Sequence, residues 1–189
     1  MGFDSSNAIA RDMVDKDKII IVEEKPLEAL QSEILTQVRD CTLAWAQGTG
    51  PVKKCDICPT EMPECLPHIS LVERLNSGSK IFKIRLVGEE IVNRTLGYMA
   101  GHFIEDLTPD FYSQALIKYY NLAIDHGHQV AQDITWDYDH RLLRIERFMV
   151  PLFLDEKDTS PTGLLIATVR GDETQDYMQK ERHFKPENA

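Results

Sequence analysis

Three strand-length apolar runs follow one another in the second half of this sequence, and they constrain its fold more than any other feature. They are HQVAQDITWDYD, RLLRIERFMVPLFL and TGLLIATVRG, at residues 128–139, 141–154 and 162–171. A tight turn around Asp139 and His140 separates the first two, and a polar loop at 155–161 separates the last two. Strands joined by such short connections pair antiparallel, because a parallel crossover needs a dozen or more residues. The pattern therefore predicts three adjacent antiparallel strands.

A hairpin and a helical block are expected upstream of these strands. Two strand-like runs, 66–75 and 81–88, flank the turn-forming stretch NSGSK, which predicts an antiparallel hairpin. The segment 89–97 has the acidic start and the terminal glycine of a short helix. The segment 108–127 predicts a long helix that ends at a glycine. This order of elements predicts an α+β domain with one five-stranded antiparallel sheet and helices on one face.

An N-terminal amphipathic helix is expected in addition to this domain. We divide the sequence into a polar arm at 1–23, a flanking helix at 24–47, the α+β domain at 48–171 and a polar tail at 172–189. Apolar residues recur in the flanking helix at steps of three and four, which places them in one stripe. The stripe must be buried, either on the chain's own sheet or on the same helix of a second subunit, and the second option predicts a homodimer. The candidate dimerisation residues are Leu27, Leu30, Ile34, Val38 and Trp45.

The composition argues against two classes of partner. The chain has 21 basic and 31 acidic residues and a net charge of -10, which opposes binding to the phosphates of nucleic acids. Its longest apolar runs are strand-sized, far short of the roughly 20 residues that cross a bilayer, so no membrane association is expected. No apolar signal segment follows Met1, and we expect a cytoplasmic protein whose four cysteines are free thiols or metal ligands.

The stretch CDICPTEMPECLPH has the spacing C-x2-C-x6-C-x2-H of a possible zinc site. Thiolates and imidazoles are the usual zinc ligands, and a C-x2-C pair with a C-x2-H pair can complete a tetrahedron. The candidate ligands are Cys55, Cys58, Cys65 and His68. One alternative function is therefore a zinc-binding adaptor. The other interpretation is structural, with Cys65 packed inward on a short helical turn at 61–66.

Several segments of the chain resemble a divergent bacterial PAS-like family. MPECLPHISLVERL precedes FKIRLVGEEIVNRTLGYMAGHFIEDL, and RIERFMVPLFLD follows downstream. The positions that match the family pattern are Leu66, Pro67, His68, Arg85, Leu86, Gly88, Gly97, Gly101, Leu107, Glu146, Pro151 and Leu152. The resemblance covers about residues 45–170. Family relatives lack the cysteines while keeping the Leu-Pro-His segment, so the resemblance does not imply a metal there.

The resemblance implies a PAS-like fold and a sensory or ligand-binding module. PAS domains bind small molecules between the inner face of the sheet and the helices, commonly dimerise through an N-terminal flanking helix, and here would signal through a separate protein. Arg85 is either exposed or directed toward the helices, where it would pair with Glu146 or an anionic ligand. The candidate ligand-binding residues are Arg85, Tyr119, Trp136 and Phe148, and no particular cofactor is indicated. No catalytic constellation is evident, so an undetected small-molecule enzyme is the second alternative.

Overall fold

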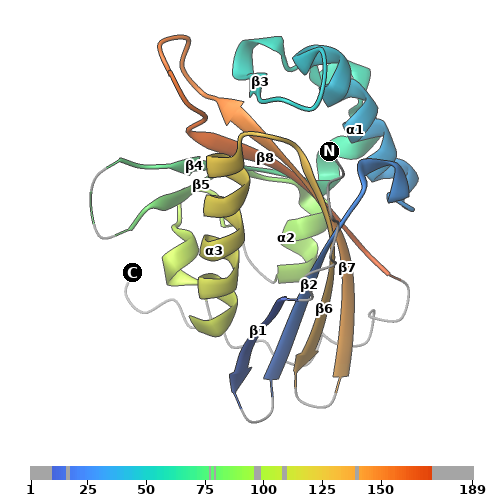
Figure 1. The fold of residues 1–189 in the computed structure, drawn as a ribbon, viewed down its shortest axis with the longest axis vertical. Helices are drawn as coiled ribbons and strands as arrows, with labels where there is room; N and C mark the ends of the chain where they lie inside the picture. Colours follow the sequence, from blue (N-terminus) through green and yellow to red (C-terminus); the bar gives the residue numbers. More distant parts are fainter. Residues whose placement is uncertain are drawn as a thin grey trace, which may run out of the picture.

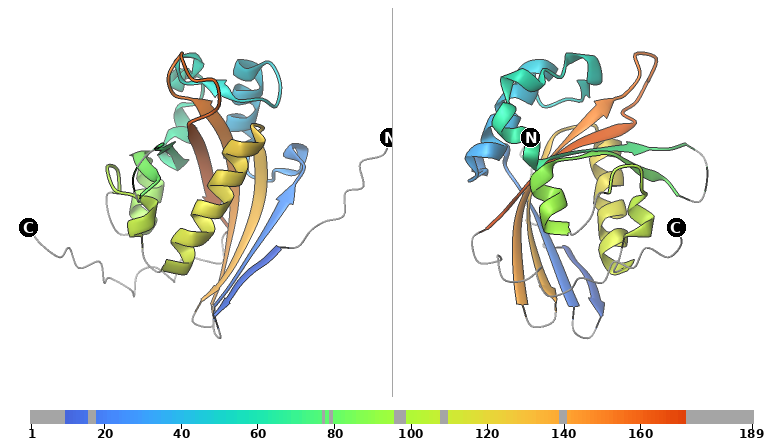
Figure 2. Two further views of the ribbon diagram at one scale, coloured as in Figure 1. Left: turned by 60° about the vertical axis from the view of Figure 1, so that its left-hand side comes forward. Right: turned by 180° about the vertical axis from the view of Figure 1, so that it is seen from behind.

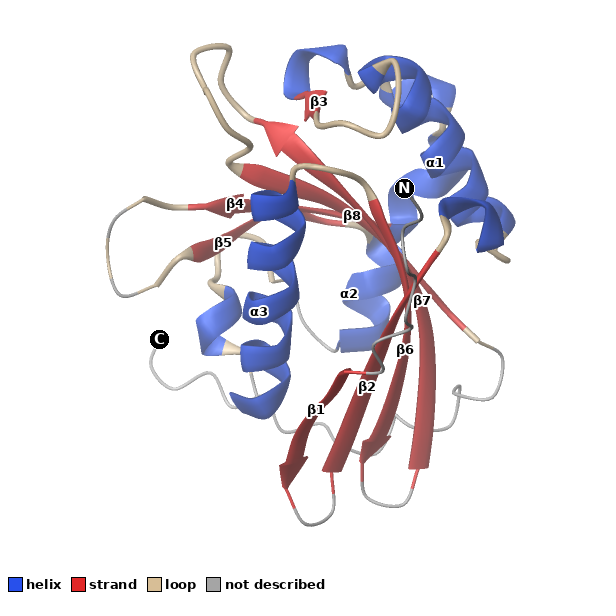
Figure 3. Ribbon diagram, in the orientation of Figure 1, coloured by secondary structure: helices blue, strands red, loops and turns tan. Residues whose placement is uncertain are grey.

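A single, mostly antiparallel sheet organises the protein (Figure 1 and Figure 3). The computed structural model describes residues 10–15, 18–76, 78, 80–95, 99–107, 110–138 and 141–171. The strand order across the sheet is β1-β2-β6-β7-β8-β4-β5, and the short β3 pairs parallel to β7. The strands are β1 (Ala10–Asp15), β2 (Lys18–Lys25), β3 (Val52–Lys53), β4 (Ile69–Arg74), β5 (Phe82–Val87), β6 (Val130–Tyr138), β7 (Arg141–Phe153) and β8 (Gly163–Arg170).

Helices and short 3-10 turns fill the connections between the strands. The α-helices are α1 (Glu33–Ala46), α2 (Glu89–Thr95) and α3 (Asp110–His126). The 3-10 turns are η1 (Leu27–Ala29), η2 (Lys54–Asp56), η3 (Pro59–Glu61), η4 (Pro63–His68) and η5 (Ile104–Asp106). Among the described residues, no helix combines the length and the apolar character needed to cross a membrane.

The structure confirms the strands expected in the second half of the sequence. β6, β7 and β8 are antiparallel neighbours, with Gln132 opposite Arg147 and Arg147 opposite Thr168. The expected hairpin is also present as the antiparallel pair β4 and β5. The turn expected around residues 139–140 and the tail at 172–189 lie outside the described residues. The α+β class and the antiparallel pairing therefore follow from patterns that are visible in the sequence.

The described part of the expected polar arm, residues 10–15 and 18–23, is not an arm, and the expected count of five strands is too low, because this segment adds two further strands. β2 pairs antiparallel with β6 from Lys18 to Lys25, and β1 pairs with β2. Ile20 and Val22 are buried beneath α3. The run IIIV at 19–22 is short and entirely β-branched, which is the signal of a buried strand. With the short β3 as well, the sheet has eight strands within the described part of the chain.

Different elements cover the two faces of the sheet (Figure 2). Phe148 and Val150 of β7 pack with Leu35 and Val38 of α1, whereas Met149 packs on the face that carries α3. This alternation is the period of two that a strand imposes on its side chains. The long helix α3 therefore covers one face of the sheet, and the separately expected N-terminal helix α1 covers the opposite face.

The apolar stripe of the flanking segment packs on the chain's own sheet, the first of the two expected alternatives. Leu30 and Val38 are buried in the core beneath α1, and the other stripe residues are partly buried against it. The helix is shorter than expected, because the chain is extended at Leu30 and α1 begins at Glu33. The N–H groups of Gln31 and Ser32 both donate to the Glu146 carboxylate, each at 2.8 Å, and this contact holds the segment extended.

Gly88 permits a close contact between two of the segments that carry the PAS resemblance. A Cβ atom at this position would lie 2.2 Å from the carbonyl oxygen of Pro67. The Gly88 N–H donates to Ile69 at 2.7 Å, and its carbonyl accepts from Ile91 and Val92 at the start of α2. The segments LPH and RLVG therefore meet at a glycine that is required for space.

Candidate functional site

A buried arginine on the α3 face of the sheet is the centre of the candidate site. Period-two alternation in β7 places Arg147 on the same face as Met149. Arg147 is 4% exposed and its strand neighbour Gln132 is 1% exposed. Two guanidinium nitrogens donate to the same amide oxygen of Gln132, Nη2 at 2.7 Å and Nε at 3.2 Å. The amide therefore orients the guanidinium group within the core.

Tyr120 of α3 covers this arginine from the helical side. The guanidinium carbon of Arg147 lies 5.6 Å from the centre of the Tyr120 ring, within the range of a cation–π contact. The same ring makes an edge contact with Phe82, at a centroid distance of 5.7 Å. Burial raises the pKa of the Tyr120 phenol, although the positive charge of Arg147 opposes this effect. The phenol is therefore neutral at physiological pH, and we name Gln132, Arg147 and Tyr120 the Arg147 cluster.

The charge of Arg147 has no acidic partner in the described part of the chain. The ion pairs found there join other residues, and none includes Arg147. The neighbouring carboxylate, Glu146, points to the opposite face and binds Lys25. A buried cation is costly unless an opposite charge pairs with it. The cluster is therefore a polar site that offers a positive charge inside an otherwise apolar layer.

An aromatic pair lies beside the cluster under the first turns of α3. Tyr112 stacks on Trp136 with a centroid distance of 4.8 Å and an interplanar angle of 11°. Burial raises the pKa of Tyr112, and the charges of Arg147 and Arg170 oppose this effect. Tyr112 therefore stays a neutral phenol at physiological pH.

The four ligand-binding candidates from the sequence occupy three different places. Tyr119 and Trp136 lie on the α3 face, in the small apolar cluster with Ile134. Phe148 lies on the other face beneath α1. Arg85 is exposed and forms an ion pair with Glu73. The structure therefore brings two of the four candidates together, and Arg85 pairs with neither Glu146 nor the helices.

Sequence reasoning did not select Arg147 or Gln132, although a signal for both was present. In RLLRIERFMV, Arg147 shares its period-two face with Ile145 and Met149, so an arginine stands in an apolar row. A charged residue in such a row is an anomaly that points to function. Its partner could not be read in the same way, because the pairing of Gln132 with Arg147 depends on the register of two strands.

The cysteine-rich stretch packs against α1, and its candidate ligands do not come together as the zinc alternative requires. Cys65 is buried with its sulfur 3.3 Å from the Gln37 amide oxygen, whereas Cys55 is exposed beside Asp56. Cys65 therefore packs inward as the structural interpretation expected, although its turn is η4 (Pro63–His68) and not a turn at 61–66. Within the described residues, no three histidine, cysteine or acidic side chains lie close enough together to hold a metal ion.

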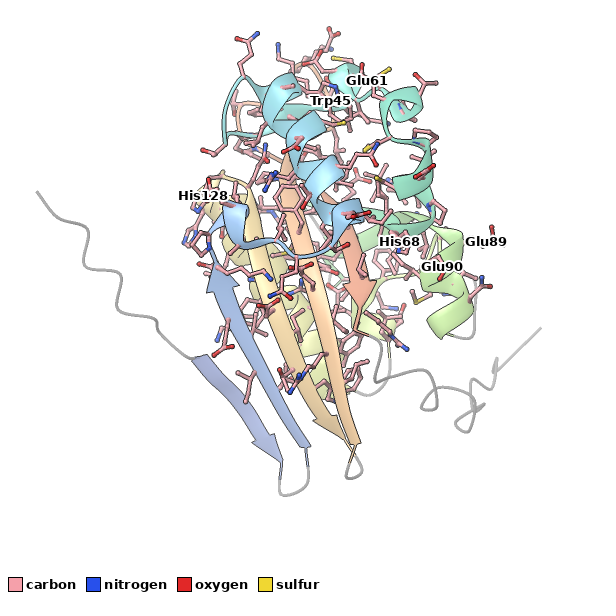
Figure 4. The ribbon with its side chains drawn as sticks, turned by 90° about the vertical axis from the view of Figure 1, so that its right-hand side faces the viewer. Trp45, Glu61, His68, Glu89, Glu90 and His128 are labelled. Carbon is pink, nitrogen blue, oxygen red and sulfur yellow. The ribbon has the colours of Figure 1, made fainter. Side chains whose placement is uncertain are left out.

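His68, the fourth candidate zinc ligand, lies apart from the hydrogen bond between Trp45 and Glu61 that joins the cysteine-rich stretch to α1. The Trp45 indole N–H donates to Glu61 at 3.0 Å. Figure 4 shows these two residues at one end of the molecule, with His68 farther down beside the start of α2. His68 therefore lies away from the Trp45–Glu61 contact.

Comparisons of the chain with family models, with curated proteins and with solved structures found no match.

Proposed function

We propose that this protein is a non-catalytic PAS-type sensory module of the cytoplasm that binds a small molecule between the sheet and α3 and signals through a separate partner. The observation that carries the proposal is the Arg147 cluster, a buried polar group at the place where the PAS resemblance locates a ligand. A core built for stability alone is packed with apolar side chains, and binding sites combine an apolar lining with a few oriented polar groups.

The arrangement of the elements supports the same proposal. A strand pair, a helical block with one long helix, and three further strands follow one another along the chain, as the resemblance implies. The helix α3 lies over the sheet face that carries the cluster. The flanking α1 packs on the opposite face of the sheet, away from the cluster.

A homodimer stays a prediction, and the structure changes where its interface would lie. Leu30 and Val38 are buried in the subunit's own core, so they are not accessible to a second copy. An interface that includes α1 would have to use the outer surface of the helix, for example around Ala44 and Trp45, which lie near its end.

Native mass spectrometry beside the denatured mass tests the proposed function. A native mass excess of a few hundred daltons that disappears on denaturation is the expected result. The function is refuted if the protein carries no such excess and no small molecule from a broad metabolite library stabilises it against thermal unfolding.

A further inference from the structure

The Arg147 cluster presents hydrogen-bond donors and a positive charge, and its acceptor is already in use. The amide oxygen of Gln132 accepts hydrogen bonds from two guanidinium nitrogens of Arg147. The other guanidinium N–H groups and the Gln132 amide N–H groups are not used in this contact, since arginine has five N–H donors and no acceptor. A site with this inventory favours an oxygen-rich anion and disfavours a cation.

The electrostatics of the surroundings point in the same direction. Arg147 is buried and its partners among the described residues, Gln132 and Tyr120, are neutral. The interaction of two charges is strengthened where water is excluded, so an anion that enters this layer gains more than one at the surface.

We infer that the ligand of the proposed sensory module is a small organic carboxylate whose carboxyl group pairs with Arg147 beneath α3. This inference rests on the proposed function and names its ligand class. A planar carboxylate matches the Nη1/Nη2 end of a guanidinium group in a bidentate pair, and Gln132, which occupies the Nε/Nη2 edge, holds the group in one orientation. The apolar part of the ligand would lie against the aromatic side chains of α3, with Tyr120 adjacent to the charge.

Thermal unfolding in a series of sodium salts tests this inference on the full chain. The midpoint is measured in acetate, benzoate, citrate and phosphate, each against chloride at equal ionic strength and pH 7. The double variant Arg147→Met, Gln132→Leu removes the cation together with the amide that would otherwise lose its partner. Arg147→Lys keeps the charge without the fork, and Arg85→Met is the matched control at an exposed arginine.

We expect at least one carboxylate to raise the wild-type midpoint by ~5–10 °C at concentrations about a hundredfold above its dissociation constant. The control Arg85→Met should keep this response, the double variant should lose it, and Arg147→Lys should bind about tenfold more weakly. If the double variant does not fold, the lysine variant decides alone.

Three outcomes overturn the inference. The first is that no carboxylate raises the unfolding midpoint of the wild type above its value in chloride. The second is that the Arg147 variants are stabilised by carboxylates as much as the wild type is. The third is that phosphate is the only salt that raises the midpoint. A neutral molecule that co-purifies and is retained by the double variant would overturn the ligand class while leaving the proposed function intact. If no molecule co-purifies with the protein and no salt raises its unfolding midpoint above that in chloride, both the proposed function and the ligand class are refuted.

Discussion

Gly88→Ala should destabilise the protein strongly, for a reason that is local and steric. A Cβ atom on Gly88 would lie 2.2 Å from the Pro67 carbonyl oxygen and 2.6 Å from that of Leu66, whereas real Cβ contacts essentially never fall below 3.0 Å. The backbone must therefore open by at least 0.8 Å, the difference between 3.0 and 2.2 Å. Since both obstacles are backbone atoms, a side-chain rotation cannot relieve the clash.

The cost of this movement can be bounded from the contacts that hold the glycine in place. The Gly88 N–H donates to Ile69, and its carbonyl accepts the first hydrogen bonds of α2 from Ile91 and Val92. Overpacking typically costs about 1–3 kcal/mol, and the loss of a hydrogen bond adds about 1 kcal/mol. We predict a loss of about 3 kcal/mol in the free energy of unfolding, or a midpoint lower by roughly 6–12 °C for a chain of this size.

Urea unfolding followed by tryptophan fluorescence measures this loss, with the slope of the transition as a check on two-state behaviour. Gly50→Ala is the matched control, because its new Cβ would have no atom within 4 Å. The control should change the stability by less than about 1 kcal/mol, in the stabilising direction if the backbone tolerates alanine. A Gly88→Ala stability within about 0.5 kcal/mol of the wild type would refute the steric argument.

Three further predictions concern the sheet and its cover. Burial would raise the pKa of Glu146, but hydrogen bonds from a lysine and two backbone N–H groups lower it overall. The carboxylate therefore stabilises the fold above about pH 4.3, its unfolded pKa, and this contribution is lost as the pH falls through the lower folded value. Glu146→Gln should lower the free energy of unfolding by roughly 1.5–3 kcal/mol at pH 7. The difference in stability between the variant and the wild type should become smaller as the pH falls, as urea titrations from pH 7 to 3 would show. Leu35→Ala should cost about 2–5 kcal/mol because this side chain is fully buried, whereas Leu86→Ala, at a side chain 45% exposed, should cost less than about 0.5 kcal/mol in the same assay. Leu30→Glu should reduce the yield of folded protein rather than produce a soluble monomer, because it places a charge in the core; a monodisperse, fully stable variant on size exclusion would contradict the packing of the stripe.

The candidate site was only partly predictable, since two kinds of information were needed to find it. The period of two along β7 is local, and it identifies Arg147 as a charge in an apolar row. The neutrality of its surroundings is not local, because Gln132 and Tyr120 come from different elements. Arg85 is the opposite case. The sequence made it a ligand-binding candidate, whereas the structure places it in an exposed ion pair with Glu73.

The sequence by itself determined the α+β class, the β4–β5 hairpin, the long α3 and the three antiparallel strands that follow it. These features depend on the spacing of apolar residues and on turn residues, which act over a few positions of the chain. Only the tertiary structure decided what each apolar face packs against. The stripe of α1 lies on the chain's own sheet, and β2 extends that sheet beside β6. Periodicity determines that a face must be buried, whereas the surface that covers it depends on residues a hundred or more positions away.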